Sequence, residues 1–511
     1  MSFDKIIYRL TDKRIPAATG IGLVGEILER AGFQEQFRNV RSENKRSRKQ
    51  IDCGAIMTTF IGLLCMGKPD FDVIAEFQND AAYYQTALHL TKGFPSSATL
   101  RQRMDEIGKT QREEILGFNT HLLKSNHVEP TALKNGMIPL DMDVTPMDNS
   151  NTKKEGVSFT YKKFMGYAPM MAYIGKEGYL VNTELREGKQ HCQSGTPEFL
   201  RQTMNLCRQI TDKPVLVRLD SGNDAAENVG ILLENGAYYV IKRNLRKEDR
   251  NEWAENIRSW CKDIREPREG KKVYVGSTFK DLFYATEDGE QKSICNRIVY
   301  EMIERDSSPD GQFFLEPEIE LNMFRTNLGE SDQEIIDLYY AHGECEQFHS
   351  EIKTDMGVER LPSGKFDTNE LVLELTMIAT SCVCLVRKRF IKVKLLLKEL
   401  SPVNAFVLLF RILFILQAAY KTRTSAFFLS AEAMPGRIPF WGWCSALLLA
   451  EFHGFRYYSQ FRTWADEFDN STMEQKKMIV CQLVKEIRIS RGYEIEIVFD
   501  INYEQFIADN Q

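Results

Sequence analysis

The stretch that decides the fold reads Met137-Ile138-Pro139-Leu140-Asp141-Met142-Asp143-Val144-Thr145. Its apolar residues predict a buried strand, and Asp143 lies where that strand ends. A second run of this kind reads Pro214-Val215-Leu216-Val217-Arg218-Leu219-Asp220 and again ends on an acid. A carboxylate just past a buried strand is held by a rigid element yet stays open to solvent, where it can bind a metal ion.

The elements expected around these two runs define a fold class. Three strand-like runs come first, at residues 137–144, 166–174 and 178–185, and a helix is predicted for residues 196–210. A buried strand, a helix and another strand then follow at residues 214–219, 225–234 and 237–242. Antiparallel strands followed by alternating helix and strand predict an α/β fold with an RNase H-like mixed sheet. In that topology the first and fourth strands end side by side, so Asp143 and Asp220 should lie close together.

A third acid lies on a predicted helix further along the chain. The steps of three and four residues between the following side chains keep them on one helical face: Tyr339, His342, Glu346, His349 and Lys353. An apolar companion face is formed by Ile335, Leu338, Phe348 and Ile352. The polar face could instead be a solvent-exposed surface with i,i+4 pairs.

Three converging carboxylates at Asp143, Asp220 and Glu346 would suit Mg²⁺, which prefers oxygen ligands and retains waters for a substrate. Two such ions can activate an attacking oxygen and stabilise a leaving one in phosphoryl transfer. The pattern therefore predicts a site for two Mg²⁺ ions, with Mn²⁺ expected to substitute.

The bulk properties exclude several classes of protein. A chain of 511 residues is too long for one core, so several units are expected. Its 11 cysteines are scattered without CxxC pairs, which argues against a structural zinc site and for a reducing cytoplasm. The start of the chain has no apolar run typical of a secretion signal. The apolar stretch at residues 405–419 is interrupted by Arg411 and too short to span a bilayer, so no membrane association is expected.

Local charge points to a polyanionic partner although the net charge is −6. Residues 38–50 hold six basic side chains and one acid, and residues 387–398 hold six basic side chains and no acid. A third cluster consists of Lys242, Arg243, Arg246, Lys247 and Arg250. Each cluster alone could be a solvated surface, but together they favour a polyanion.

The following division of the chain is expected. Residues 1–135 should form a helical domain, to which the resemblance described below adds binding of DNA ends; residues 136–246 should form the first part of the α/β core that carries the acids, and residues 247–330 an inserted β-rich subdomain of short strands. Residues 331–395 complete the core, and residues 396–511 form a helical region with a terminal hairpin.

The helix predicted after Ser96 in the first of these regions could be the recognition helix of a helix-turn-helix, with Arg101 and Arg103 facing a major groove. An ordinary capped surface helix fits the same pattern.

These motifs resemble the DDE transposases of bacterial insertion sequences, and most closely a cut-and-paste group with a Tyr-x2-Arg-x3-Glu-x6-Lys signature. Here the signature is Tyr339-x2-His342-x3-Glu346-x6-Lys353, with histidine in place of arginine. Asp143-Val144-Thr145 matches the first catalytic strand and Asp220-Ser221-Gly222 the second motif. The segment that runs from Lys353 to Arg360 also looks like the continuation found in the family.

The resemblance implies a role for each matching position. Asp143, Asp220 and Glu346 would bind the metal ions and carry the catalysis. Contacts to DNA are implied for Tyr339, His342, Lys353 and Arg360, and the basic cluster is expected to bind terminal DNA through Lys45, Arg46, Arg48 and Lys49. Some members stack a flipped base on a tryptophan; at that place this chain has Met323 and Phe324, the expected substitutes.

Two other interpretations remain open at this point. Asp141 and Asp143 match the Asp-x-Asp-x-Thr motif of haloacid-dehalogenase-like phosphatases, in which Asp141 would be the nucleophile. Loss of Asp141 should abolish activity in such a phosphatase and have a milder effect in a transposase. A catalytically inactive DNA-binding protein is the third interpretation.

The function expected from the resemblance is transposition by a cytoplasmic bacterial protein acting on DNA. The chain would bind the terminal inverted repeats of its own element, cut them by metal-dependent hydrolysis, and join the freed 3′-hydroxyl to target DNA. Because two ends must be brought together, we expect a homodimer on double-stranded DNA.

Overall fold

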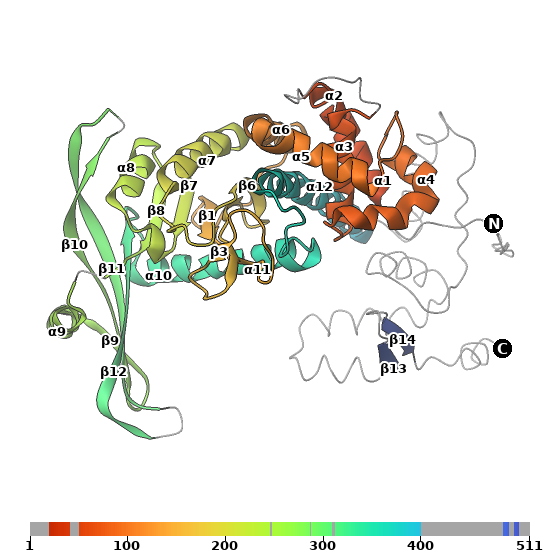
Figure 1. The fold of residues 1–511 in the computed structure, drawn as a ribbon. Helices are drawn as coiled ribbons and strands as arrows, with labels where there is room; N and C mark the ends of the chain where they lie inside the picture. The colour runs from red at the N-terminus through yellow and green to blue at the C-terminus, as the bar shows by residue number, and fades with distance from the viewer. Residues whose placement is uncertain are drawn as a thin grey trace. The chain divides into compact units, whose positions relative to one another are not determined.

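The computed structural model describes residues 20–40, 51–245, 248–286, 288–308, 312–399, 484–489 and 495–499 (Figure 1). The chain divides into two compact units, one of residues 16–402 and one that combines residues 1–15 with residues 403–511. In the second unit, β13 (Val484–Ile489) pairs antiparallel with β14 (Ile495–Phe499). The basic side chains Lys45, Arg46, Arg48 and Lys49, and residues 400–483 of the expected C-terminal region, lie outside the described residues.

The centre of the large sheet has the order β6-β5-β1-β7-β8. Its strands are β1 (Ile138–Val144), β5 (Met170–Ile174), β6 (Tyr179–Glu184), β7 (Val215–Leu219) and β8 (Tyr238–Lys242). β5 is antiparallel to both β1 and β6, while β7 is parallel to both β1 and β8. The connections after β6 and β7 carry α7 (Thr196–Ile210) and α8 (Ala226–Glu234). This order and these directions confirm the RNase H-like mixed sheet.

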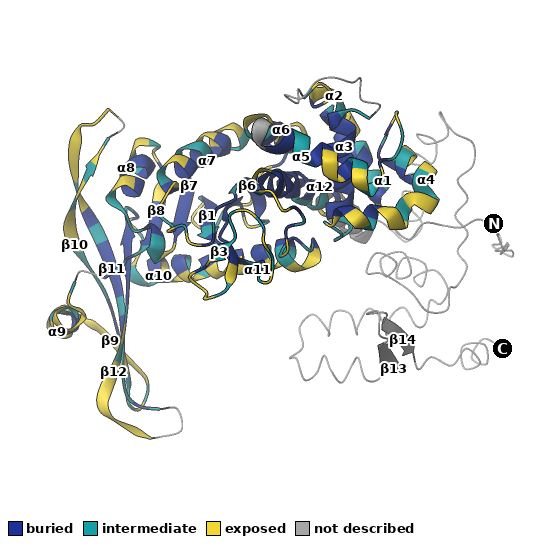
Figure 2. Cartoon of the chain, in the orientation of Figure 1, coloured by how far each residue is buried: buried dark blue, intermediate teal, exposed yellow. Residues whose placement is uncertain are grey.

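The insertion continues the same sheet as a long ribbon. It contains α9 (Arg250–Trp260), β9 (Asp263–Arg268), β10 (Lys271–Ala285), β11 (Gln291–Ser307) and β12 (Phe313–Thr326). β12 pairs antiparallel with β8, so the full order ends in β8-β12-β11-β10-β9. Figure 2 shows that the ends of this ribbon are largely exposed.

Short strands were expected in the insertion, but β10, β11 and β12 have 15, 17 and 14 residues. Gly276 has a low strand propensity, yet β10 continues through it because Gly276 pairs with Tyr300 of β11. Added there, a Cβ atom would lie 2.4 Å from the Tyr300 hydroxyl oxygen. Cross-strand pairing therefore sets the strand length where local propensity does not.

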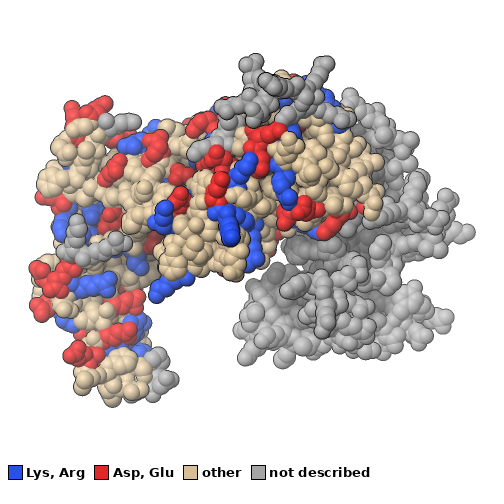
Figure 3. Space-filling view, viewed as in Figure 1, with Lys and Arg blue, Asp and Glu red and all other residues tan. Residues whose placement is uncertain are grey.

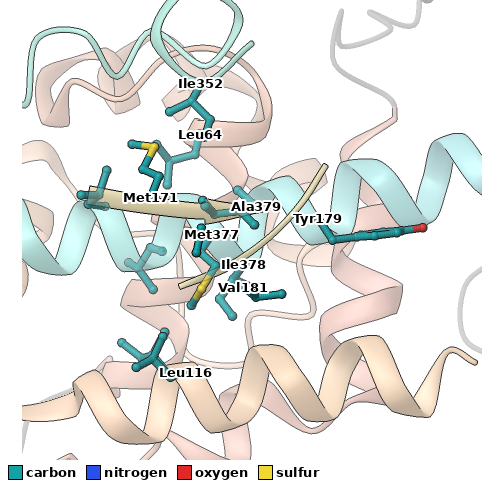
Figure 4. Close-up of a cluster of buried hydrophobic side chains, with 14 of the residues drawn as sticks. Leu64, Leu116, Met171, Tyr179, Val181, Ile352, Met377, Ile378 and Ala379 are labelled. Atoms are coloured by element: carbon teal, nitrogen blue, oxygen red, sulfur yellow. The ribbon is translucent and has the colours of Figure 1, made fainter. Parts of the chain in front are cut away.

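The long helix α12 (Phe366–Glu399), which follows the sheet in the chain, packs against the N-terminal helices α3 and α6 and against β6. The N-terminal helices are α1 (Ile21–Arg30), α2 (Phe33–Gln36), α3 (Cys53–Cys65), η1 (Phe71–Asp80), α4 (Ala81–Ala87), α5 (Ser97–Ile107), η2 (Gly108–Gln111) and α6 (Arg112–Ser125). Figure 4 shows Leu64, Val181 and Met377 in the shared core. Residues 366–388 form a helix that is long and apolar enough to cross a membrane, and 83% of its 18-residue apolar window is buried inside the protein.

A polar network lies inside this helical junction. The Arg112 guanidinium of α6 donates to Asn182 Oδ1 of β6 at 3.0 Å and lies 3.4 Å from Glu374 Oε1 of α12. Burial raises the pKa of Glu374 to about 8, with the positive charge of Arg112 opposing the shift and Glu370 adding to it. Glu374 is therefore mainly protonated at neutral pH.

This raised pKa predicts how stability depends on pH. The folded protein retains a proton on Glu374 that the unfolded chain releases near its ordinary pKa of 4.5. The stability that Glu374 contributes is therefore fully present below pH 4.5 and is lost as pH rises towards about 8. We expect the free energy of unfolding of the wild type, relative to Glu374→Gln, to fall across that interval. Urea unfolding at several pH values measures this difference. Glu114→Gln, which removes an exposed carboxylate of α6, is the matched control. A pH-independent difference for Glu374→Gln would contradict the assignment.

Candidate active site

Two acids meet at the edge where β1 and β7 end. In the parallel register of these strands Asp141 is opposite Arg218 and Met142 is opposite Leu219, so one further step places Asp143 opposite Asp220. Neighbouring strands lie about 4.8 Å apart. Asp143 is partly buried and Asp220, which directly follows β7, is exposed. The ring of Tyr161 is largely exposed, but desolvation around its hydroxyl, followed by the charges of Asp143 and Asp220, raises the pKa of Tyr161 to about 12, as expected when both acids lie near it.

Tyr339 holds one of these acids from the helix above. It lies in α10 (Asp332–Tyr340), and its hydroxyl donates to Asp220 Oδ1 at 3.0 Å. Burial and the neighbouring Asp220 raise the pKa of Tyr339, which keeps it protonated as a donor. The Tyr339 ring packs on Phe324 with 4.7 Å between the ring centroids.

Glu346 lies on the continuation of that helix, which changes pitch several times. α10 is followed by the 3₁₀ turn η4 (Ala341–Gly343), α11 (Glu344–Ser350) and the π-helical turn η5 (Glu351–Asp355). Glu346 is exposed on α11, while its neighbours Cys345 and His349 are buried. Such π-helical turns are frequent at functional sites.

The environment of the three acids suits a divalent cation. Among the described residues, neither Asp143 nor Asp220 nor Glu346 forms an ion pair with a lysine or arginine, so their negative charge is available to a metal ion. Oxygen ligands of this kind match Mg²⁺ or Mn²⁺. Within the part of the chain that is described, however, no three acidic, His or Cys side chains stand close enough together to hold a metal, so Glu346 does not close a cage here.

A buried ion network lies directly beneath this edge. Arg218 Nε and Nη2 each donate to a carboxylate oxygen of Asp141 at 2.6 Å, and Nη1 donates to the Leu338 carbonyl at 3.0 Å. His342 Nδ1 lies 2.9 Å from Asp141 Oδ1. All three charged side chains are buried. The network thereby joins β1, β7 and the helix that carries Tyr339 and Glu346.

Electrostatics in the network favour its ionised form. Burial alone would raise the pKa of Asp141, but hydrogen bonds and charges from His342 and Arg218 lower it overall. Burial alone would lower the pKa of His342, but the hydrogen bond and charge of Asp141 raise it overall. Each partner thus stabilises the charge of the other.

The network corrects two expectations from the sequence. His342 was expected to contact DNA in place of the family arginine, but its imidazole is buried against Asp141 and does not face solvent. Asp141 is enclosed by Arg218 and His342, so it cannot act as the nucleophile of a phosphatase, and that alternative is not favoured. A mild effect of losing Asp141 is no longer expected, because its loss would leave the buried Arg218 charge uncompensated.

Two more side chains border the acids: His349, which had no assigned role, and Lys353, which was expected to contact DNA. His349 Nε2 lies 3.5 Å from Asp143 Oδ2, and Nδ1 lies 3.0 Å from the Tyr173 hydroxyl. Lys353 donates to the Pro146 carbonyl, three residues after Asp143, and lies 3.8 Å from Glu359. The polar face of the predicted helix contained His349, and that spacing was the signal that could have identified it.

The expected base-stacking residues are part of the core. Met323 and Phe324 are both buried, and Phe324 packs between Tyr339 and Tyr340. Neither offers an exposed face to a flipped base. Their position follows from β12, whose last residues pair with β8 inside the sheet.

The expected DNA-facing arginines differ from one another. Ser96 caps α5 by accepting from Thr99 N, as the sequence predicts. Arg101 is exposed and pairs with Asp72 at 2.8 Å, whereas Arg103 is buried and donates to Glu106 and to Cys53 Sγ. Arg103 therefore does not face a DNA groove. Arg360 is exposed beyond η5.

Comparison with known proteins identifies a family to which the chain is similar. A family model described as "Transposase DDE domain group 1" matches residues 3–426. No curated protein matches the sequence. Among solved structures, a piggyBac transposase synaptic complex with hairpin DNA, determined by cryo-EM, is similar over 73% of this chain and 75% of that chain, with 11% sequence identity and a TM-score of 0.38.

The buried pair predicts a large loss of stability on removal of one partner. Asp141→Asn should lower the free energy of unfolding by about 3–5 kcal/mol, because Arg218 would remain buried without its counter-charge. In a double-mutant cycle with Arg218→Met, the double variant should lose much less than the sum of the single changes. Glu76→Gln, which breaks the exposed pair with Lys68, is the control and should cost less than about 1 kcal/mol. Equal costs for Asp141→Asn and this control would contradict the structural role.

The burial of Phe324 predicts a role in folding. Phe324→Ala should lower the free energy of unfolding by about 3–5 kcal/mol, because it leaves a cavity beside Tyr339. Phe313→Ala is a matched control at the exposed start of the same strand, where the side chain is 77% exposed, and it should have little effect. Guanidinium unfolding of both variants distinguishes them. Wild-type stability in Phe324→Ala would reopen its assignment as a base platform.

Proposed function

The chain belongs to the group 1 family of transposase DDE domains, and from this membership we propose that it cuts the ends of a mobile DNA element and joins them to target DNA. The observation that carries this proposal is that the acids at the end of β1 and β7 differ in their partners. Asp141 is neutralised by Arg218 and His342, whereas Asp143 and Asp220 face the edge of the sheet without a lysine or arginine partner among the described residues. Such carboxylates are suited to metal ions rather than to the stability of the core.

We assign Asp143, Asp220 and Glu346 as the ligands of two divalent ions, Mg²⁺ in the first place. When bound, such a pair of ions activates an attacking oxygen and stabilises a leaving one. Tyr339 occupies one oxygen of Asp220 and leaves the other free. His349 lies beside Asp143 and limits the directions in which that carboxylate can turn. Glu346 is exposed on α11, a short helix between two changes of helical pitch, and we propose that α11 moves on DNA binding so that Glu346 joins the two aspartates.

The reaction follows from these groups and from the family. Water attacks a phosphodiester at the element end and frees a 3′-hydroxyl and a 5′-phosphate. The 3′-hydroxyl then attacks a phosphodiester of the target DNA in line, which forms the new ester bond and releases a 3′-hydroxyl of the target strand. Lys353, in η5, and Arg360, which is exposed after η5, are proposed to contact the phosphates of the bound strand. Tyr339, which was also expected to contact DNA, is buried and donates to Asp220, so we propose that it positions that carboxylate. Two ends must be held at once, so the active form is proposed to be a homodimer on terminal inverted repeats.

The regions outside the core are assigned to DNA binding. Residues 1–135, with Arg101 exposed on α5 and the basic cluster of residues 38–50, are proposed to hold the element end, and phosphate contacts would dominate its affinity. The DNA that flanks the gene tests the assignment to a bacterial insertion sequence. Inverted repeats bordered by short direct duplications are expected there, and their absence would count against it.

Substitution of the three acids tests the proposed catalysis. Asp143→Asn, Asp220→Asn and Glu346→Gln preserve size while each removes one negative charge from the metal site. Each variant should reduce Mg²⁺-dependent cleavage and strand transfer by at least about 10³-fold, because one site serves both steps. Binding to element ends should remain, since its determinants lie in other parts of the chain. Gel assays of cleavage and transfer, with binding measured in parallel, provide both readouts.

The matched controls are Glu344→Gln and Glu351→Gln, which remove neighbouring acids of the same helix path. Both should retain most of the activity. Cleavage near the wild-type rate by Glu346→Gln, with loss of activity in one of these controls, would move the third ligand to that residue. Unchanged activity of Asp143→Asn or Asp220→Asn would overturn the proposed site.

A further inference from the structure

A small flap beside the active site exposes aromatic side chains. We define the flap as residues 149–167, in which β3 (Ser158–Phe159) and β4 (Met165–Tyr167) pair antiparallel, and β4 also pairs with β2 (Met147–Asp148). Phe159, Tyr161 and Met165 are 59%, 63% and 43% exposed. Phe159 and Met165 are cross-strand partners, so their side chains lie on the same face of the flap. Exposed apolar side chains gathered in this way mark an interaction surface.

The flap is anchored at the catalytic edge. The Tyr161 hydroxyl donates to the carbonyl oxygen of Val144 at 3.3 Å, and Val144 directly follows Asp143. Thr160 N and Oγ1 both donate to the Phe164 carbonyl and close the turn. The exposed rings are thus carried by a short, hydrogen-bonded hairpin that is joined to the strand of the proposed metal ligand Asp143.

The charge of the flap is positive. Residues 151–165 contain four lysines and one acid, and that acid, Glu155, accepts a hydrogen bond from the Phe366 amide. Lys162 and Lys163 are exposed and form no ion pair with any described residue. Lys162 Nζ lies 5.6 Å from the centre of the Tyr161 ring. In Figure 3, lysine and arginine side chains border a largely uncharged surface in this part of the molecule.

We propose that the flap binds unpaired nucleotides next to the cleaved phosphodiester, with bases stacked on Phe159 and Tyr161 and phosphates held by Lys162 and Lys163. Flat rings beside unpaired lysines match single-stranded nucleic acid, whose bases stack on aromatic side chains while its phosphates contact cations. This inference rests on the proposed function. It gives the flap the role of base platform that the buried Phe324 cannot fill.

Binding of labelled oligonucleotides to the full chain without divalent metal tests the proposal. The double variant Phe159→Ala/Tyr161→Ala should bind a single-stranded oligothymidine at least about tenfold more weakly than the wild type, because two stacking surfaces are lost. Its affinity for a duplex of the same length should change by less than about twofold, since duplex bases are already stacked. Phe279→Ala/Phe283→Ala is the matched control, with two rings that are 63% and 69% exposed on the ribbon, and its affinity for both probes should be unchanged.

A second readout separates stacking from a loss of structure. 2-Aminopurine placed in the unpaired strand should be quenched on binding to the wild type, but not on binding to Phe159→Leu/Tyr161→Leu, which keeps apolar bulk and removes the rings. Tyr161→Phe, which removes only the hydrogen bond to Val144, should retain the quenching. Wild-type affinity and quenching in both double variants would overturn the flap proposal alone. A wild-type chain that binds neither probe would instead contradict the proposed function.

Discussion

The active-site edge depends on the buried contact of Arg218 with Asp141, to which His342 is joined. Arg218 bridges β7 to β1 through two hydrogen bonds and reaches the Leu338 carbonyl on the helix above. Burying such charges carries a desolvation cost, and a well-packed apolar substitute is often as stable. What the network adds is a fixed position for three elements. It fixes β1, β7 and α10 relative to one another, and these elements lead directly to Asp143, to Asp220 and, through η4, to the helix that carries Glu346.

Because strand residues two positions apart lie on the same face, the side chains of β1 and β7 form two layers. The inner layer has compensated charge and the outer layer carries net negative charge. Asp141 and Asp143 are two positions apart on β1, and Arg218 and Asp220 are two positions apart along β7 and its end, so each pair lies on one face. In the inner layer, Asp141 meets Arg218 and the charges cancel. In the outer layer, two aspartates meet; the Tyr339 hydroxyl and the His349 imidazole lie beside them, and among the described residues neither aspartate has an ion pair with lysine or arginine. The negative charge that remains at the solvent edge is the basis for the proposed metal binding.

The sequence predicted what depends on local periodicity and missed what depends on distant partners. The order of β1, β5, β6, β7 and β8 followed from apolar runs and turn signals. The capped start of α5 followed from Ser96 for the same reason. The length of β10 depends on its pairing with β11, and the burial of His342 depends on Asp141, 201 positions earlier in the chain, so neither was visible locally. The aromatic residues of the flap were missed because exposure is a property of the folded chain. The three metal ligands remain predictions.

The central claim is that Asp143, Asp220 and Glu346 bind divalent metal together, and anomalous diffraction at the manganese edge tests it most directly. Crystals of the full chain with an element-end DNA and Mn²⁺ should show anomalous peaks within about 2.0–2.3 Å of carboxylate oxygens from all three residues. Asp141 should remain paired with Arg218 and make no contact with the metal. Manganese bound elsewhere, or bound by the two aspartates while Glu346 stays in solvent in the presence of DNA, would contradict the account.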